Sequence, residues 1–313
     1  MIDGYILSYN NPDTDSVCSS IAYSYYLKKH NKNYIPVISG NISPETSFVL
    51  NVANVDVPSK KLILEPNKKI ILIDTHNIAQ IPHLTAADNV IEIIDHHSDG
   101  DINIFKTADI TNKRIGAVAS IIAEKCLDEN IMNQTLAVLL GSAIISNTVN
   151  FTAPSTTYYD KMIFEKIEQY YDFGKDYTFR MFKYKNRILN KRKSEILASD
   201  EKNYIIANYN IRISQLEIVN VSKHICFEDF YREMEIIINN DNLDVYIVSF
   251  IDVANLKTYI LVSDEYSSKL VQLIFNQNSL KKLYEFNRVL LRKTDLVPKL
   301  HNAIDRLTQI TGE

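Results

Sequence analysis

Ile91-Glu92-Ile93-Ile94-Asp95-His96-His97-Ser98 is the stretch that decides the fold class, because a run of β-branched apolar residues stops at an acid and two adjacent imidazoles. Runs of this kind are typical of strands in a parallel sheet, which are buried on both faces. The carboxyl ends of such strands are where α/β folds bind ligands and carry out chemistry. The sequence therefore predicts a parallel strand at 91–94 with a functional site at its end.

Two other apolar runs end in the same way. The run at 69–73 stops at Asp74, and the run at 4–7 opens into the loop 8–16. Because parallel strands end at the same edge of a sheet, these runs direct a set of acids and imidazoles towards one place. The members of this set are Asp13, Asp15, Asp74, His96 and His97.

Such a set of carboxylates and imidazoles predicts a divalent metal. Converging carboxylates repel one another, and buried ones lack solvation, unless a cation lies among them. Each acid by itself has a simpler interpretation, since a lone Asp after a strand is usually a turn former or a helix N-cap. For Asp15 both interpretations stay open, because Asp15-Ser16 opens a helix with apolar periodicity.

The composition narrows the class of protein. With 313 residues the chain fits two domains of ordinary size, and 46% hydrophobic residues with 7 Gly and 8 Pro argue against disorder. The formal net charge of −4 argues against a general nucleic-acid-binding surface. Cys18, Cys126 and Cys226 are widely spaced, which favours reduced thiols over a disulfide framework. No signal peptide or membrane span is visible, so the predicted location is the cytoplasm.

The first half of the chain alternates strands and helices. Besides the three runs above, we predict helices at 16–30 and 44–52, a helix start at 115–124, and strands at 33–38 and 61–64. Residues 135–146 are apolar on nearly all sides, which predicts a buried helix. This helix ends at the polar residues Ser146-Asn147-Thr148, and a ligand shell is one way to supply the partners that buried polar groups need.

The second half contains a further α/β pattern. The basic run at 183–193 is interpreted as the solvated face of a linker helix, with a substrate role as the alternative. Strands are predicted at 203–208, 211–219, 243–250 and 257–261, with a helix near 228–239 and a final helix after Arg292-Lys293. The predicted fold class is α/β, with an N-terminal, mainly parallel sheet that has helices on both faces, and a smaller C-terminal α/β domain.

Four motifs in this order resemble the DHH phosphoesterase superfamily. They are the loop Asn11-Pro12-Asp13-Thr14-Asp15-Ser16, the strand that ends in Asp74, the Asp95-His96-His97 triplet, and the segment Ser-Ala-Ile-Ile-Ser-Asn-Thr at 142–148. Within it the chain most resembles the family II, manganese-dependent inorganic pyrophosphatases, whose C-terminal domain is of the DHHA2 type. This resemblance implies a DHH domain at 1–187, a linker at 188–200 and a DHHA2-type substrate-binding domain at 201–313.

The resemblance also implies an activity and roles for individual residues. It implies a phosphohydrolase that cleaves inorganic pyrophosphate to phosphate with two divalent cations, Mn²⁺ or Mg²⁺. Asp74 would bridge the cations, Asp13 would serve the first, and Asp15 with His96 would serve the second. His97, Lys202, Arg292 and Lys293 would bind the phosphate groups, and Asp74, His97, Lys202 and Arg292 would be catalytic. The partner would be a small anionic phosphate and neither nucleic acid nor membrane, while a monomer and a homodimer both stay open.

Two positions depart from the pattern of that family. The family has a histidine ligand where this chain has Tyr9, and an acidic ligand where it has Asn147, so both are expected to be degenerate ligands. The loss of the imidazole is expected to move the first site towards Mg²⁺, and the loss of an anionic ligand is expected to weaken metal binding overall. Two alternatives to a pyrophosphatase therefore stay open, namely an exopolyphosphatase of short polyphosphate and a non-catalytic phosphate-binding pseudoenzyme. A nuclease or a cyclic-dinucleotide phosphodiesterase is the alternative that we rank last.

Overall fold

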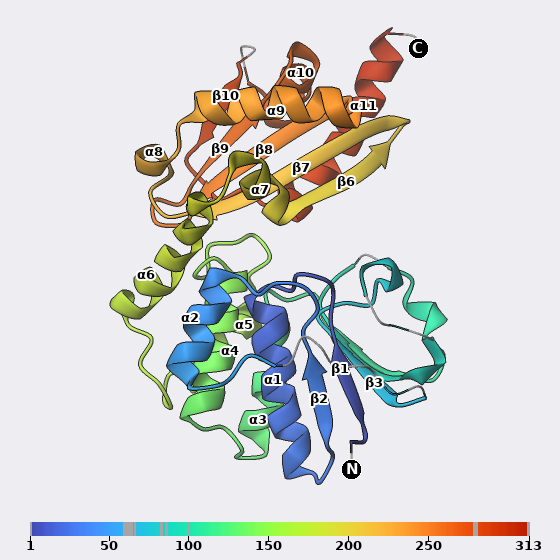
Figure 1. Cartoon of the computed structure of the whole chain (residues 1–313), viewed down its shortest axis with the longest axis vertical. Coiled ribbons are helices and arrows are strands. Elements are labelled where there is room, and N and C mark those ends of the chain that lie inside the picture. The colour runs from blue at the N-terminus through green and yellow to red at the C-terminus, as the bar shows by residue number, and fades with distance from the viewer. Residues whose placement is uncertain are drawn as a thin grey trace. The chain divides into compact units, whose positions relative to one another are not determined.

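The computed structural model describes residues 2–58, 65, 67–81, 84, 87–98, 100–277 and 281–311. The chain divides into two compact units, residues 1–184 and 185–313 (Figure 1). The predicted strand at 61–64 lies outside the described residues. The boundaries of the two predicted domains and of the linker between them stay predictions.

The first unit is built on a parallel sheet. Its strands are β1 (Gly4–Leu7), β2 (Tyr34–Val37), β3 (Lys69–Ile73), β4 (Val90–Asp95) and β5 (Asp109–Asn112). Their order in the sheet is β2-β1-β3-β4-β5, and every neighbouring pair is parallel. From β1 the chain moves to one side of the sheet for β2 and then to the other side for β3. In open α/β sheets ligands bind outside the carboxyl ends of the strands at such a reversal, here between β1 and β3.

Helices cover one face of this sheet. They are α1 (Thr14–Lys29), α2 (Pro44–Ala53), α3 (Val118–Asp128), α4 (Gln134–Asn147), α5 (Tyr158–Ile167) and α6 (Lys175–Lys183). Helix α1 packs on β1, β2 and β3, and α3 packs on β4. Residues 136–145 of α4 are buried, which confirms the predicted buried helix. At Gly141 in this helix a Cβ would meet the Phe173 ring at 2.3 Å, so the close packing requires glycine.

The other face of the sheet has a different cover. Alternate residues of the strands, among them Tyr5, Leu72 and Ile93, form a buried cluster on that side. Within the described residues this cluster is completed by Ile81 and Phe105, which follow the short 3₁₀ helices η1 (Ile78–Gln80) and η3 (Ile102–Ile104); η2 (Ala87–Asn89) precedes β4. The α/β class with a parallel sheet is confirmed, and the second face is covered in these parts by 3₁₀ turns.

The second unit is built on a mixed sheet. Its strands are β6 (Glu201–Ile206), β7 (Tyr209–Ile218), β8 (Val245–Asp252), β9 (Lys257–Val262) and β10 (Leu283–Phe286), in the order β10-β9-β8-β7-β6. Only the pair of β7 and β8 is parallel among these neighbours. The predicted strands of this unit are thus present, whereas β10 was not predicted.

Helices pack on both faces of the mixed sheet. They are α7 (Lys193–Leu197), α8 (Val221–His224), α9 (Phe227–Asp241), α10 (Glu265–Phe275) and α11 (Val297–Thr311), with 3₁₀ helices η4 (Tyr184–Asn190) and η5 (Ala198–Asp200). One buried cluster joins the sheet to α7 and α9, and the other joins it to α10 and α11 (Figure 1). A short π-helix, η6 (Arg292–Leu296), precedes α11. The predicted basic pair at 292–293 lies in this element, and π-helices occur frequently at functional sites.

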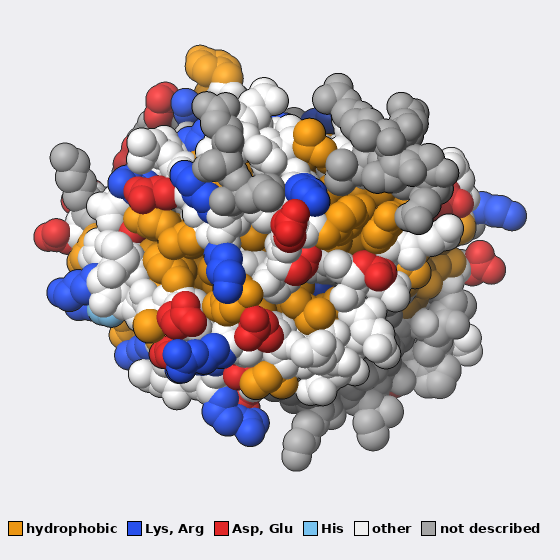
Figure 2. Space-filling view, turned by 90° about the horizontal axis from the view of Figure 1, so that it is seen from above, with side chains coloured by type: hydrophobic (Ala, Val, Ile, Leu, Met, Phe, Trp, Pro, Cys, Tyr) orange, Lys and Arg blue, Asp and Glu red, His pale blue; other side chains and the backbone are white. Residues whose placement is uncertain are grey.

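The surface and the helices bear on possible partners. Acidic and basic side chains are interspersed on the described part of the face seen in Figure 2, and they form no broad basic area there. Within the described part of the chain, every helix is too short or too polar to span a bilayer.

Candidate metal centre

Asp74 lies at the centre of the polar groups in the first unit. It directly follows β3, its backbone N–H donates to the Ile94 carbonyl of β4 at 2.9 Å, and its side chain is only 1% exposed. Its φ of 64° lies in the left-handed region, where Asp is tolerated better than most residues. Sparsely populated backbone conformations of this kind cluster at functional sites. The fold therefore holds the carboxylate at the point where the strand order reverses.

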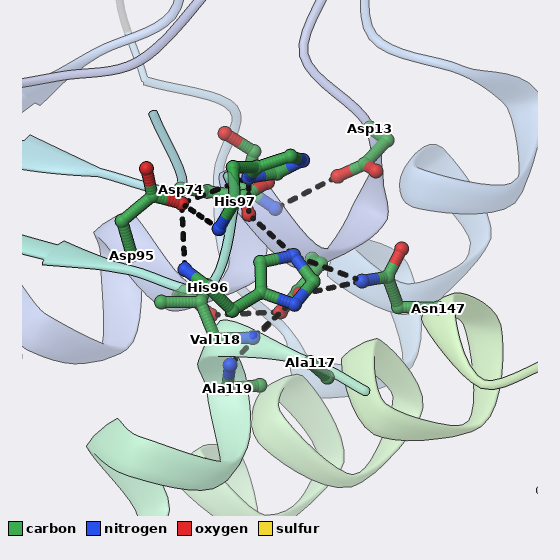
Figure 3. A network of polar contacts seen from close by, with 12 residues as sticks. Asp13, Asp74, Asp95, His96, His97, Ala117, Val118, Ala119 and Asn147 are labelled. Atoms are coloured by element: carbon green, nitrogen blue, oxygen red, sulfur yellow. Dashed lines mark hydrogen bonds and ion pairs between the residues drawn. The ribbon is translucent and has the colours of Figure 1, made fainter. Parts of the chain in front are cut away.

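His96 turns one ring nitrogen towards Asp74. Its Nδ1 lies 2.8 Å from the Ile115 carbonyl, so Nδ1 carries a hydrogen and Nε2 keeps its lone pair when the ring is neutral. This Nε2 lies 3.2 Å from Asp74 Oδ1 (Figure 3). Two acceptor atoms at that distance attract a proton or a cation between them. A fixed tautomer of this kind is also how proteins orient histidine ligands of metals.

His97 is oriented by Asp95, the last residue of β4. Asp95 Oδ1 lies 2.8 Å from His97 Nδ1 and accepts the backbone N–H of His96 at 2.7 Å. Asp95 Oδ2 contacts Nδ1 of the buried His76. Burial raises the pKa of Asp95, but the hydrogen bonds from His76 and His97 lower it more, so its pKa lies well below the usual range. Asp95 therefore stays ionised and leaves Nε2 as the ring nitrogen of His97 that can reach another group.

Asp13 and Tyr9 lie in the loop between β1 and α1, and this loop contributes both side chains to the surroundings of Asp74. Asp13 is the N-cap of α1, and one of its carboxylate oxygens accepts the Ser16 N–H at 2.9 Å. That oxygen therefore has the ordinary capping role of an Asp that precedes a helix. The Tyr9 hydroxyl accepts the Asp13 N–H at 3.2 Å. Burial, and then the charges of Asp13 and Asp74, raise the pKa of Tyr9 well above its usual value. Tyr9 is therefore a neutral phenol beside two carboxylates.

Asp15 lies in α1, but its carboxylate caps the N-terminus of α3. Its carboxylate accepts the N–H groups of Val118 at 2.8 Å and Ala119 at 3.0 Å, which are orphan donors at the start of α3. Asp160 accepts the preceding N–H groups, those of Gly116 at 2.8 Å and Ala117 at 3.3 Å. Two buried carboxylates thus cap one helix, a favourable arrangement at the positive end of the helix dipole.

The amide of Asn147, at the end of α4, contacts Asp15. Its Nδ2 donates to Asp15 Oδ2 at 3.0 Å and to the Gly116 carbonyl at 2.8 Å, and lies 3.5 Å from His96 Nε2 (Figure 3). Burial, and then the charge of Asp74, raise the pKa of Asp15. A donor from Asn147 partly offsets this concentration of negative charge.

The residues around Asp74 fit a divalent cation. One ligand atom each from Asp74, His96 and His97 lies within 4.8 Å of the others. Carboxylate oxygens and imidazole nitrogens form a donor set suited to Mn²⁺ or Zn²⁺. The surroundings of Asp15 do not fit a second cation, because N–H and O–H donors already surround its carboxylate.

Three predicted site residues lie in the second unit. The Arg292 guanidinium donates to the Asp200 carboxylate at 2.6 Å, to the Asp200 carbonyl at 2.8 Å and to the Ile213 carbonyl at 3.2 Å. Lys202, on β6, and Lys293, in the π-helix, are exposed. Asp200 therefore fixes the orientation of Arg292 within this unit.

Most of the predicted site residues of the first unit lie together, and two further residues support them. The structure brings Tyr9, Asp13, Asp74, His96, His97 and Asn147 to the same end of the sheet as Asp15. Figure 3 shows Asp13, Asp74, His96, His97 and Asn147 there. The sequence did not predict a role for His76 or for Asp95. A signal was present in the pattern, since His76 is a polar residue two positions after a strand that ends in Asp74. The roles of the predicted residues in binding and catalysis stay predictions.

Comparison with known proteins identifies the class. Residues 4–144 match the DHH family, N-terminal domain, and residues 180–303 match the DHHA2 domain. A probable manganese-dependent inorganic pyrophosphatase from Clostridium acetobutylicum is 31% identical over 307 residues, which cover 96% of this chain and 98% of the relative. A manganese-dependent inorganic pyrophosphatase from Methanothrix thermoacetophila is 29% identical, with the same coverage of 96% and 98%.

A solved structure supports the same assignment. The crystal structure of a putative family II inorganic pyrophosphatase from Methanococcus jannaschii superimposes with a TM-score of 0.77 at 29% identity, covering 96% of this chain and 99% of that one. Fold and site thus define a DHH phosphoesterase with a DHHA2 domain, as the sequence motifs predicted. Such a protein is a hydrolase. More closely, the chain belongs to the family of manganese-dependent inorganic pyrophosphatases.

Proposed function

We propose that this chain hydrolyses inorganic pyrophosphate to phosphate with the help of a divalent cation. The observation that carries the proposal is the cluster of Asp74, His96 and His97, with ligand atoms within 4.8 Å of one another, at the switch point of the parallel sheet. Support comes from relatives along nearly the whole chain that are named manganese-dependent inorganic pyrophosphatases. We also propose the cytoplasm as its location.

We assign the cation to Asp74 and His96, with Asp13 beside them. A divalent cation supplies positive charge for the phosphate oxygens and makes a water molecule more acidic. Asp74 brings a buried negative charge, and the Ile115 carbonyl keeps the His96 Nε2 lone pair turned towards it. Of the two cations predicted from the sequence, this assignment accounts for one.

The remaining residues are assigned to the substrate. With Nδ1 held by Asp95, His97 has Nε2 left to contact a phosphate oxygen. Lys202, Lys293 and Arg292 supply the positive charge that a pyrophosphate anion needs, and Asp200 orients the guanidinium. The residues at 201–313 would thus form the substrate-binding domain. Positioning and charge stabilisation account for most of the catalysis of phosphoryl transfer.

Phosphate release tests the proposal. The purified chain is assayed with pyrophosphate, tripolyphosphate and longer polyphosphate, each with Mg²⁺, Mn²⁺ and Co²⁺. We expect fastest turnover with pyrophosphate, and faster turnover of tripolyphosphate or longer chains would assign an exopolyphosphatase instead. Absence of turnover in every combination, with ligand binding seen by calorimetry, would identify a pseudoenzyme and refute the proposed activity.

A further inference from the structure

The carboxylate of Asp15 has no acceptor position left over. Oδ1 accepts from Ala119 N at 3.0 Å and Ser19 Oγ at 3.2 Å, and Oδ2 accepts from Val118 N at 2.8 Å and Asn147 Nδ2 at 3.0 Å. An ionised carboxylate offers about four lone-pair sites, and four donors occupy them. A cation can therefore bind Asp15 only if one of these donors leaves.

Asn147 Nδ2 is the donor that occupies the position of a cation. It lies among a carboxylate oxygen of Asp15, the carbonyl oxygen of Gly116 at 2.8 Å and the imidazole Nε2 of His96 at 3.5 Å. Oxygen and imidazole acceptors that converge on one point also make a metal site. Here the point is filled by an amide nitrogen, whose hydrogens carry partial positive charge.

The segment after Asn147 is a tight turn that fixes the backbone next to this residue. Val149, Asn150 and Phe151 have φ values of 47°, 51° and 64°, and such a conformation is an outlier for the β-branched Val149. Thr148 secures the turn, because its hydroxyl donates to the Ile144 carbonyl at 2.6 Å and accepts the Phe151 N–H at 3.0 Å. A strained turn persists only where the surrounding contacts determine it, so the backbone that follows Asn147 is fixed. The amide itself is held by its hydrogen bonds to Asp15 and to the Gly116 carbonyl.

We propose that the Asn147 amide takes the place of a second cation, so that this chain binds one divalent cation at Asp74 and none at Asp15. The inference rests on the cation dependence in the proposed function and deepens it. Asp15 is then the cap of α3, and Asn147 ties that cap to the Gly116 carbonyl. The charge that a second cation would bring to the substrate is absent.

The number of bound ions tests this proposal. We measure Mn²⁺ per chain by equilibrium dialysis with metal analysis, and magnetic coupling between ions by electron paramagnetic resonance. The wild-type chain should bind one Mn²⁺ without a coupled pair, and Asn147→Asp should bind two that are coupled. The matched control is Asn150→Asp, which adds the same charge at an exposed position three residues further on and should keep the count at one. Two ions in the wild-type chain, or one in Asn147→Asp, would overturn the proposal.

A second variant keeps the test decisive if the first one folds poorly. Asn147→Asp places a negative charge beside Asp15 Oδ2, so its metal-free form should melt at a lower temperature and regain stability with Mn²⁺. Asn147→Ala frees the same lone pair of Asp15 without adding charge, and a second, weaker Mn²⁺ should then bind. A count that stays at one in Asn147→Ala would contradict the idea that the amide excludes the ion.

Phosphate release separates this inference from the proposed function. Pyrophosphate hydrolysis by a wild-type chain that holds two Mn²⁺ refutes the inference and leaves the function intact. One bound Mn²⁺ without hydrolysis refutes the function and supports the inference.

Discussion

Asp74 and Asp15 are the same residue type at neighbouring places in the fold, yet their surroundings differ. Both side chains are 1% exposed. Asp74 directly follows β3, and Asp15 lies in the first turn of α1, which comes after β1; β1 and β3 flank the point where the sheet order reverses. Asp74 faces the Nε2 lone pair of His96 at 3.2 Å, whereas Asp15 faces N–H donors at the start of α3. Burial and position along the chain therefore do not define the role of a carboxylate. The donors and acceptors around it do.

The largest expected effect comes from Asp74→Asn. Asn tolerates the left-handed φ of 64°, so the fold should persist while the charge that holds the cation is lost. We expect kcat/KM for pyrophosphate with Mn²⁺ to fall on the order of 10³-fold or more, since even changes behind the ligands of a metal cost roughly 10–100-fold. Phosphate release measures this. The control is Asp101→Asn at an exposed cap, and a loss below tenfold in Asp74→Asn would remove Asp74 from the centre of the site.

The next effect is on stability and concerns Asp15→Asn. One carboxamide oxygen cannot accept from all the donors of Asp15, and its NH₂ would face N–H groups of α3. We expect the free energy of unfolding to fall by about 2–4 kcal/mol, in the range for buried donors that lose a charged acceptor. Denaturant titration measures it.

Asp160→Asn gives the matched comparison, because Asp160 caps the same helix through Gly116 and Ala117. If Asp15 acts as a cap, both variants lose stability and both still bind one Mn²⁺. An Asp15→Asn chain that keeps its stability but binds Mn²⁺ more than tenfold more weakly would make Asp15 a ligand, and the contrast with Asp74 would disappear.

The contrast also shows what the sequence could predict. The strands at 69–73 and 91–94 were predicted because buried parallel strands are continuous β-branched runs, and their ends gave Asp74 and His96. The edge strand β5 was missed because its four residues, Asp-Ile-Thr-Asn, are mostly exposed and polar. The donors to Asp15 could not be predicted, since Val118 and Asn147 lie 103 and 132 residues further along the chain. Only tertiary structure brings them to the carboxylate.

A pH titration of the metal-free chain sharpens the comparison through Asp95. Hydrogen bonds from His76 and His97 overcome the effect of burial, so the folded pKa of Asp95 lies below the unfolded value of about 3.9. An acid with a lowered pKa contributes stability that is complete above the unfolded pKa and is lost as the pH falls through the folded pKa. Between about pH 5 and pH 2 the wild-type chain should therefore lose more unfolding free energy than Asp95→Asn.

Denaturant unfolding at a series of pH values provides that measurement. Asp101→Asn, at an exposed position, should follow the wild-type curve. Parallel curves for the wild type and Asp95→Asn would show that Asp95 does not hold the two histidines through its charge, and the orientation of His97 would need another cause.

The smallest expected effect is that of Tyr9→His, which acts on the Asp74 side only. The Tyr9 hydroxyl lies beside Asp13 and Asp74, and burial and then these two charges raise its pKa, so it stays a neutral phenol. A neutral phenol oxygen is a poor ligand, whereas imidazole suits transition metals. We expect Mn²⁺ to bind about tenfold more tightly, which corresponds to about 1.4 kcal/mol, and Mg²⁺ affinity to change less, because Mg²⁺ prefers oxygen ligands. Tyr9→Phe, which removes only the hydroxyl, is the control and should show no gain. Equal gains for both metals would point to a general effect of charge, and a gain in Tyr9→Phe would mean that the hydroxyl had been blocking the ion.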